Sequence, residues 1–292
     1  MPRLPCALVR YSCLALISLG MLLPALGSAQ PGTPNNASLD RRIALVIGNG
    51  DYHFSALKNP VNDARDMADA LRSLGFEVEY RENANMRTML DATRRFVLKS
   101  PSYGVRLFYY AGHGVQINGR NYLIPVDADI QSEEDVPLKS ADVGEILERL
   151  GQNKSGMNLV ILDACRNNPF ANGAMVLADG RRLKFRGPTP AGLAPLDAPT
   201  GTLVAFSTAP GAVAIDGVGA AHSLYTKHLL ANLPTPGLPV EQLFKRVRVA
   251  VIQETKRQQV PWESSSLMGD FCFKTAEGGA CVYDSSLFTR QQ

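Results

Sequence analysis

The stretch VRLFYYAGHG, residues 105–114, joins an apolar run to a polar end. Apolar and aromatic residues dominate from Val105 to Tyr110, and His113 then stands between two glycines. Such a run, bounded by glycine, predicts a buried strand. In an open α/β sheet, sites form where the strands end at their carboxyl side. His113 is therefore a candidate site residue.

Similar apolar runs alternate with amphipathic stretches along the chain. The segment Asn62–Leu74, for example, places Ala64, Met67 and Leu71 on one helical face. We expect strands at Ile43–Ile47, Glu77–Tyr80, Val105–Tyr110, Met157–Leu162, Thr202–Phe206 and Phe271–Phe273, and helices at Asn62–Leu74, Met86–Leu98, Val143–Leu150, Ser223–Leu233 and Val240–Lys256. This alternation predicts an α/β fold with a mainly parallel sheet flanked by helices.

The composition excludes some classes of protein. With 292 residues, 45% of them hydrophobic, the chain can bury a core, so a wholly disordered protein is excluded. The 30 basic and 27 acidic residues nearly balance. Bulk charge therefore gives no reason to expect nucleic acid or an anionic membrane as a partner.

The N-terminus has the order of a secretory signal peptide. Arg3 and Arg10 precede the apolar run Leu14–Leu23, and small residues follow at 27–29. We expect residues 1–29 to be removed and the protein to be exported, either to a periplasm or out of the cell. The apolar run is short for a transmembrane helix and no later segment is longer, so no stable membrane span is expected after removal. An uncleaved anchor is the alternative.

A second segment that could take part in catalysis is DACRN, residues 163–167, in which Cys165 follows a predicted strand. Cysteine catalysis needs a thiolate, a base that takes its proton, and donors for the oxyanion. Cys165 and His113 at neighbouring strand ends would supply the first two. The backbone N–H groups of Gly114 and Cys165 are the expected oxyanion donors. The alternative is a buried structural thiol beside a turn histidine.

The order and spacing of these two motifs indicate a family. His113 precedes Cys165 by 52 residues, and caspases place their histidine about 50 residues before the cysteine. From Arg42 to Phe273 the sequence resembles the caspase-like cysteine peptidases, and among them the bacterial metacaspase and paracaspase-like members. The resemblance rests on the motifs Ile47–Asn49, Asn62–Ala64, Tyr110–Gly114, Asp163–Cys165 and Phe206–Gly211.

The resemblance implies a caspase-like α/β/α sandwich and a cysteine endopeptidase that acts on proteins or peptides. His113 would be the general base and Cys165 the nucleophile, and no third triad member is clearly encoded. A second hypothesis is a catalytically idle or ligand-gated interaction module with the same fold. The sequence predicts no oligomeric state.

The resemblance also divides the chain. Residues 1–29 would be the signal peptide, 30–41 a linker, 42–273 the peptidase domain and 274–292 a C-terminal tail. Within the domain, 42–168 is large-subunit-like, 169–200 is a basic, Gly/Pro-rich linker, and 201–273 is small-subunit-like. Candidate processing positions in that linker are Arg181, Arg182, Lys184 and Arg186. A solvated surface loop is the equal alternative.

Charge predicts the specificity. Animal caspases cleave after Asp and use Arg in their primary pocket, whereas the corresponding residues here are acidic. Asp63 and Asp163 match acidic pocket residues of metacaspases and paracaspases. Asp216 lies a few residues after Ser207–Gly211, where animal caspases carry a pocket Arg. Carboxylates in one pocket would bind a guanidinium or ammonium group, so we expect cleavage after Arg or Lys. The alternatives are a helix N-terminal carboxylate for Asp63 and a turn residue for Asp216.

The remaining histidines and the single tryptophan have no motif. For His53, His222 and His228 we expect solvated or core roles. Trp262 lines a substrate subsite or fills the core.

No cofactor or metal motif is evident. Zinc and EF-hand spacings are absent, and Gly48-Asn49-Gly50 lacks the third glycine of a dinucleotide loop. Some metacaspases are calcium-activated, but no calcium site can be located in the sequence. Cys272 and Cys281 are close enough in sequence to pair in an oxidising compartment, which would leave Cys165 unpaired in the exported chain.

Overall fold

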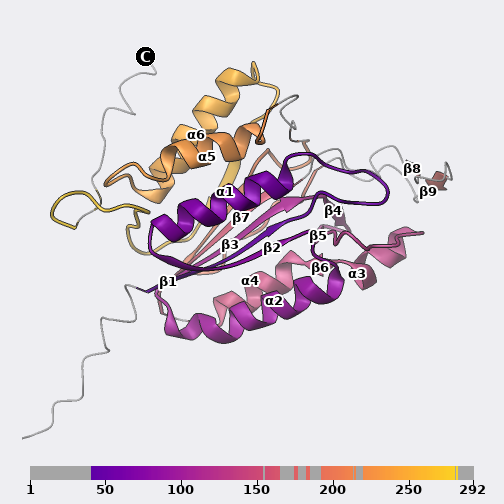
Figure 1. The fold of residues 1–292 in the computed structure, drawn as a ribbon, viewed down its shortest axis with the longest axis horizontal. Coiled ribbons are helices and arrows are strands. Elements are labelled where there is room, and N and C mark those ends of the chain that lie inside the picture. The colour runs from indigo at the N-terminus through magenta and orange to yellow at the C-terminus, as the bar shows by residue number, and fades with distance from the viewer. Residues whose placement is uncertain are drawn as a thin grey trace, which may run out of the picture. The chain divides into compact units, whose positions relative to one another are not determined.

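The central feature of the fold is a sheet of mostly parallel strands between two layers of helices (Figure 1). The computed structural model describes residues 41–153, 155–164, 192–212, 214, 220–279 and 281, with the backbone alone at 174–176 and 182–184. These residues belong to one compact unit, Asn36–Gln292. The predicted signal peptide lies outside the described residues.

The main sheet has the strand order β11-β10-β7-β3-β1-β2. Its strands are β1 Arg42–Gly48, β2 Phe76–Glu82, β3 Val105–Gly112, β7 Met157–Ala164, β10 Thr202–Phe206 and β11 Trp262–Ser265. All neighbours pair in parallel except β10 and β11, which are antiparallel. The expected α/β fold with a mainly parallel sheet is confirmed.

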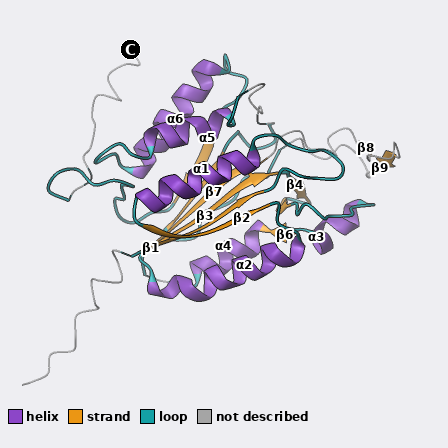
Figure 2. Cartoon of the chain, in the orientation of Figure 1, coloured by secondary structure: helices purple, strands orange, loops and turns teal. Residues whose placement is uncertain are grey.

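The helices cover both faces of this sheet (Figure 2). The covering helices are α1 Pro60–Ser73, α2 Met86–Lys99, α4 Val143–Gly151, α5 Leu224–Asn232 and α6 Val240–Glu254, whereas the short helix α3 Val136–Lys139 packs in a separate apolar cluster. Ala44 and Val46 of β1 pack in the core beneath α1, α5 and α6. Ile43 and Leu45 of the same strand pack in the core beneath α2 and α4. This alternation is what a strand buried on both faces produces.

Two parts of the sheet structure differ from the expectation. The strand expected at Phe271–Phe273 is wrong, because Cys272 makes only an isolated bridge with Pro239. The edge strand next to β10 is β11, whose polar sequence Trp262–Ser265 carries no apolar run. A small sheet also forms from β4 Gly114–Ile117, β5 Arg120–Leu123 and β6 Ala141–Asp142.

The hairpin between β4 and β5 has a clear local cause. Its turn residues Asn118 and Gly119 have φ values of 52° and 76°. Asn-Gly is the pair that a tight hairpin turn of this kind favours, because both residues tolerate positive φ. A further short antiparallel pair joins β8 Ala174–Val176 to β9 Arg182–Lys184.

Within the part of the chain that the structure describes, none of the helices has the length and hydrophobicity that crossing a bilayer would need.

Candidate active site

The register of two neighbouring strands defines the site. β3 and β7 pair in parallel up to Gly112 opposite Ala164. His113 is the next residue after Gly112 and is described. Cys165, which follows Ala164, lies outside the described residues, as does Asp216.

The His113 ring is buried and held by a backbone carbonyl. His113 is 1% exposed, and its Nε2 lies 2.7 Å from the carbonyl oxygen of Ser55. Because a carbonyl oxygen can only accept, we assign the proton to Nε2, and Nδ1 is then the basic nitrogen of the neutral ring. The ring also packs against Tyr52 and Phe54, with centroid distances of 4.5 and 5.6 Å. A main-chain atom thus helps to orient the His113 ring.

A buried network of tyrosine hydroxyls fixes the backbone of His113. The His113 N–H donates to the Tyr52 hydroxyl at 2.9 Å, and that hydroxyl donates to the Ile124 carbonyl at 3.1 Å. The Tyr110 hydroxyl lies 2.9 Å from the His113 carbonyl oxygen. Burial holds the pKa of Tyr110 well above its ordinary value. Tyr110 therefore remains a protonated donor.

Position 112 needs a glycine, because these two hydroxyls lie where a side chain at this position would be. A Cβ at position 112 would lie 2.6 Å from the Tyr52 hydroxyl oxygen and 2.7 Å from that of Tyr110. Both distances are below van der Waals contact, so the two tyrosines can approach the strand only where no side chain stands.

Gly114 directs its N–H away from the small sheet. The Ile124 N–H donates to the His113 carbonyl at 3.0 Å, which is one of the two bonds of a hydrogen-bonded pair, while the His113 N–H donates to Tyr52. In an antiparallel ladder the next pair, Gly114 and Leu123, is then a non-hydrogen-bonded pair. A Cβ on Gly114 would lie 3.0 Å from the Cβ of Ala164. The Gly114 backbone thus passes beside the end of β7.

Asp63 and Asp163 converge on one residue, Ser223. Both carboxylates are fully buried, one in the first turn of α1 and the other on β7. The Ser223 N–H donates to Asp63 Oδ1 at 3.0 Å, and the Ser223 hydroxyl donates to Asp163 Oδ2. Thr226 Oγ1 also donates to Asp163 Oδ2, at 2.9 Å. The two predicted pocket residues therefore meet at the N-terminus of α5, where the helix dipole favours negative charge.

The buried charge of Asp163 affects a neighbour on α5. Burial, together with the Asp163 carboxylate, holds the pKa of Tyr225 well above its ordinary value. The phenol of Tyr225 therefore stays neutral beside this carboxylate.

His222 lies against the same carboxylates. Its Nδ1 is 3.1 Å from Asp63 Oδ1, and its Nε2 is 3.0 Å from Asp66 Oδ2. The solvated or core role expected for His222 is therefore wrong. Sequence reasoning also missed Asp66, although residues 63 and 66 share one face of a helix.

The other histidines and Trp262 lie elsewhere. His53 is exposed, and His228 Nε2 lies 2.8 Å from Glu254 Oε2 on the surface. Trp262 is 48% exposed on β11, so it does not fill the core, and its role in a substrate subsite stays a prediction.

The remaining predicted positions are partly described. Arg182 and Lys184 lie on β9, where the backbone alone is described, while Arg181 and Arg186 lie outside the described residues. A disulfide joins Cys272 to Cys281, with a Cα–Cα distance of 5.7 Å. Among the described residues, no cluster of His, Cys, Asp or Glu side chains is arranged to hold a metal ion.

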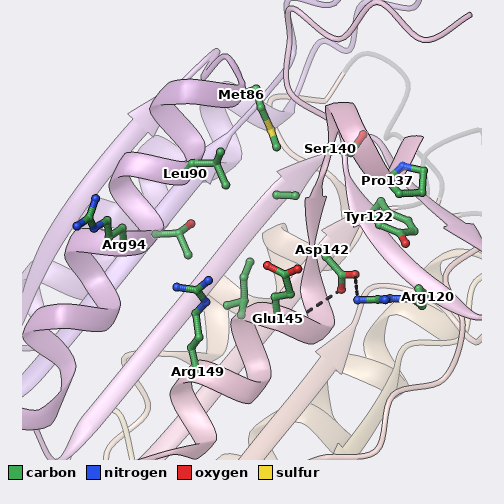
Figure 3. A pocket seen from close by; sticks show the side chains of 13 residues that line it. Met86, Leu90, Arg94, Arg120, Tyr122, Pro137, Ser140, Asp142, Glu145 and Arg149 are labelled. Atoms are coloured by element: carbon green, nitrogen blue, oxygen red, sulfur yellow. Dashed lines mark hydrogen bonds and ion pairs between the residues drawn. The ribbon is translucent and has the colours of Figure 1, made fainter. Parts of the chain in front are cut away.

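A cavity of about 400 Å³ lies on the α2 and α4 side of the molecule (Figure 3). Its walls include Leu90 of α2, Tyr122 of β5 and Arg149 of α4, and Arg120 forms an ion pair with Asp142 at 2.5 Å. None of the predicted site residues that the structure describes lines this cavity.

Comparison with known proteins agrees with the fold and the motifs. The family model of the caspase domain, Peptidase_C14, matches residues 41–272. The chain belongs to this family, and the resemblance of its sequence to the caspase-like peptidases is confirmed.

Curated relatives match about half of the chain. The mucosa-associated lymphoid tissue lymphoma translocation protein 1 of Homo sapiens is 30% identical over 146 residues, which are 49% of this chain and 17% of that protein. The paracaspase of Dictyostelium discoideum is 29% identical over 133 residues, which are 43% of this chain and 31% of that protein. The match thus spans less than a third of each relative.

Proposed function

We propose that this protein is a cysteine endopeptidase that cleaves after Arg or Lys, with His113 as general base and Cys165 as nucleophile. The observation that carries the proposal is the pairing of Gly112 with Ala164 at the ends of β3 and β7. The next residues along these strands are His113 and Cys165. Neighbouring strands lie about 4.8 Å apart, so the described ends of β3 and β7, from which His113 and Cys165 follow in sequence, lie side by side.

The proposed reaction uses His113, Cys165 and two backbone N–H donors, with water as the second nucleophile. His113 Nδ1 takes the proton of the Cys165 thiol, and the thiolate attacks the scissile carbonyl carbon. The N–H groups of Gly114 and Cys165 donate to the oxyanion that forms. The protonated His113 then gives its proton to the leaving amine as the C–N bond breaks, which leaves a thioester on Cys165. Water, deprotonated by His113, hydrolyses the thioester and releases the carboxylate product and the thiol.

The preference for a basic residue rests on the buried carboxylates of Asp63 and Asp163. A guanidinium or ammonium group complements them, and charge-assisted hydrogen bonds are about twice as strong as neutral ones. An acidic side chain at the same position would meet like charges in a poorly solvated site. Asp216 is proposed as a further acidic residue of this pocket.

The proposal extends to location and maturation. Residues 1–29 would direct export and be removed, so that the enzyme acts outside the cytoplasm or is secreted. An enzyme with this specificity would also cleave its own linker at Arg181, Arg182, Lys184 or Arg186.

The test is peptide cleavage by the purified protein. Fluorogenic peptides ending in Arg, Lys or Asp are offered to the wild type and to Cys165→Ala and His113→Ala variants, with and without calcium. We expect the wild type to cleave the Arg and Lys peptides and each variant to lose at least about 10³-fold in rate. If the wild type cleaves no better than Cys165→Ala, the peptidase proposal is wrong and an interaction module remains. A preference for Asp would overturn only the pocket.

A further inference from the structure

We propose that in the resting protein His222 fills the position beside Asp63 where the basic side chain of the substrate binds, a position that we call the seat. A substrate then binds by displacing His222 from Asp63. This inference rests on the proposed function and adds a specificity-determining residue to it. The contact between His222 and the fully buried carboxylate of Asp63 is the observation that carries it.

The contacts of His222 are those of a cation between two acids. Its Nδ1 faces Asp63 at 3.1 Å and its Nε2 faces Asp66 at 3.0 Å. A neutral imidazole has one N–H and can donate to only one of these carboxylates, whereas an imidazolium donates to both. The geometry therefore matches a positively charged ring, the same charge that an Arg or Lys side chain would bring.

The side chain of His222 is also more exposed to solvent than that of Asp63. Asp63 is fully buried, the side chain of His222 is 21% exposed, and that of Asp66 is 50% exposed. Exposure thus increases from Asp63 through His222 to Asp66. The imidazole is therefore nearer to solvent than the carboxylate of Asp63 that it contacts.

The contact of Asp63 with Ser223 is held in place by further hydrogen bonds of Ser223. Ser223 donates to Asp63 through its backbone N–H, and its hydroxyl both donates to Asp163 and accepts from the Thr226 N–H at 2.9 Å. These hydrogen bonds hold Ser223 in place as the N-cap of α5. The imidazole of His222, by contrast, can move by rotation about its side-chain bonds. Of the contacts that Asp63 makes with His222 and Ser223, the one with His222 is replaceable.

The exchange of one cation for another explains why the site would prefer a basic side chain of the substrate over a neutral or acidic one. When an arginine replaces the imidazolium, Asp63 keeps a charged donor. The exchange therefore avoids the free-energy penalty of leaving a buried carboxylate without a cationic partner. A planar guanidinium, with its five N–H donors, can also reach a second carboxylate such as Asp163. A neutral or acidic side chain cannot replace the imidazolium in this way, so His222 would stay in place and exclude it.

The experiment compares substitutions that move KM in opposite directions. His222→Ala empties the seat, and we expect KM for an Arg peptide to fall about threefold or more with little change in kcat. His222→Lys places a permanent cation near Asp63, and we expect KM to rise. His228→Ala is the matched control, because it removes the same residue type from α5 at a surface pair with Glu254, and it should leave KM unchanged.

A binding measurement separates this inference from the proposed activity. In Cys165→Ala protein, benzamidine serves as an inert cationic probe, and its affinity is measured by calorimetry with and without the His222 substitutions. We expect tighter binding in His222→Ala, weaker binding in His222→Lys, and movement of the His222 ring signals in NMR spectra on binding. If benzamidine binds in this pattern but peptides are not cleaved, the proposed function fails while the seat stands. If peptides are cleaved but the His222 variants leave KM and benzamidine affinity unchanged, or if His222→Ala weakens binding, the inference is overturned.

Discussion

The backbone N–H of His113 donates to the hydroxyl oxygen of Tyr52 at a distance of 2.9 Å. The same loop, after β1, also places the Ser55 carbonyl 2.7 Å from the His113 ring. The loop thus holds this histidine at two points, once through its backbone and once through its imidazole. The orientation of the proposed base therefore depends on residues far from the catalytic motifs in sequence.

Removing the Tyr52 hydroxyl should disturb both stability and activity. In Tyr52→Phe the buried N–H of His113 loses its acceptor, which costs about 1–3 kcal/mol of unfolding free energy. We expect kcat for the Arg peptide to fall by one to two orders of magnitude, roughly the effect of a catalytic group misplaced by about 1 Å. Thermal unfolding and steady-state kinetics measure the two effects.

Tyr80→Phe is the control for this change. Tyr80 donates to Glu82 at 2.7 Å on the edge strand β2, away from His113. We expect nearly wild-type kcat for this variant. If Tyr52→Phe matches it in both stability and kcat, the Tyr52 contact does not position His113.

A methyl group at Gly112 should have a larger effect than at an open glycine. The added Cβ in Gly112→Ala would lie 2.6 Å from the Tyr52 hydroxyl, so the tyrosine network must shift. We expect a loss of about 1–3 kcal/mol in unfolding free energy, as for other overpacked sites, and a loss of peptidase activity. Gly269→Ala is the matched control, because nothing lies within 4 Å of its added Cβ. Equal unfolding midpoints for the two variants would contradict the close approach at Gly112.

Apolar periodicity predicted most of the main sheet, and it failed where packing is one-sided. The strands β1, β3, β7 and β10 are buried runs, and each was predicted within two residues at either end. The edge strand β11 has the sequence Trp-Glu-Ser-Ser and pairs on one side only, with β10, so no apolar pattern marks it. The β4–β5 hairpin was missed although Asn118-Gly119 carries a turn signal.

The candidate site was predicted where it depends on residue type, and not where it depends on backbone or on long-range packing. Motifs indicated His113, Asp63 and Asp163. The carbonyl of Ser55 has no residue-type signal, because every residue has a carbonyl group. The contact of His222 with Asp63 arises from the packing of α1 against α5, across 159 residues of sequence. Periodicity within one helix cannot reveal such a contact.

The disulfide should stabilise the C-terminal end of the domain. Cys272 and Cys281 close a short loop, with a sequence separation of 9. Restricting the unfolded chain over such a loop is worth about 2–3 kcal/mol. We expect Cys281→Ser to lower the unfolding midpoint and to make it insensitive to reductant. Cys165→Ser is the control and should keep the wild-type sensitivity to reductant, whereas a wild type indifferent to reductant would argue against the disulfide.

The carboxylate of Glu77 should give a small pH-dependent contribution to stability. Its hydrogen bond from Tyr103, and then that from Lys99, hold the pKa of Glu77 below its ordinary value of 4.5. A pKa lowered in the folded state stabilises the protein above the unfolded-state pKa, and that stabilisation is lost as the pH falls through the folded-state pKa. We expect Glu77→Gln to lose about 0.2–1 kcal/mol near neutral pH, because the side chain is half exposed. In urea unfolding from pH 7 to pH 3, the difference between wild type and Glu77→Gln should shrink below about pH 4.5. Substitution of the exposed Glu277 by Gln supplies the baseline, and a difference for Glu77→Gln that grows toward acid would show that the sign is wrong.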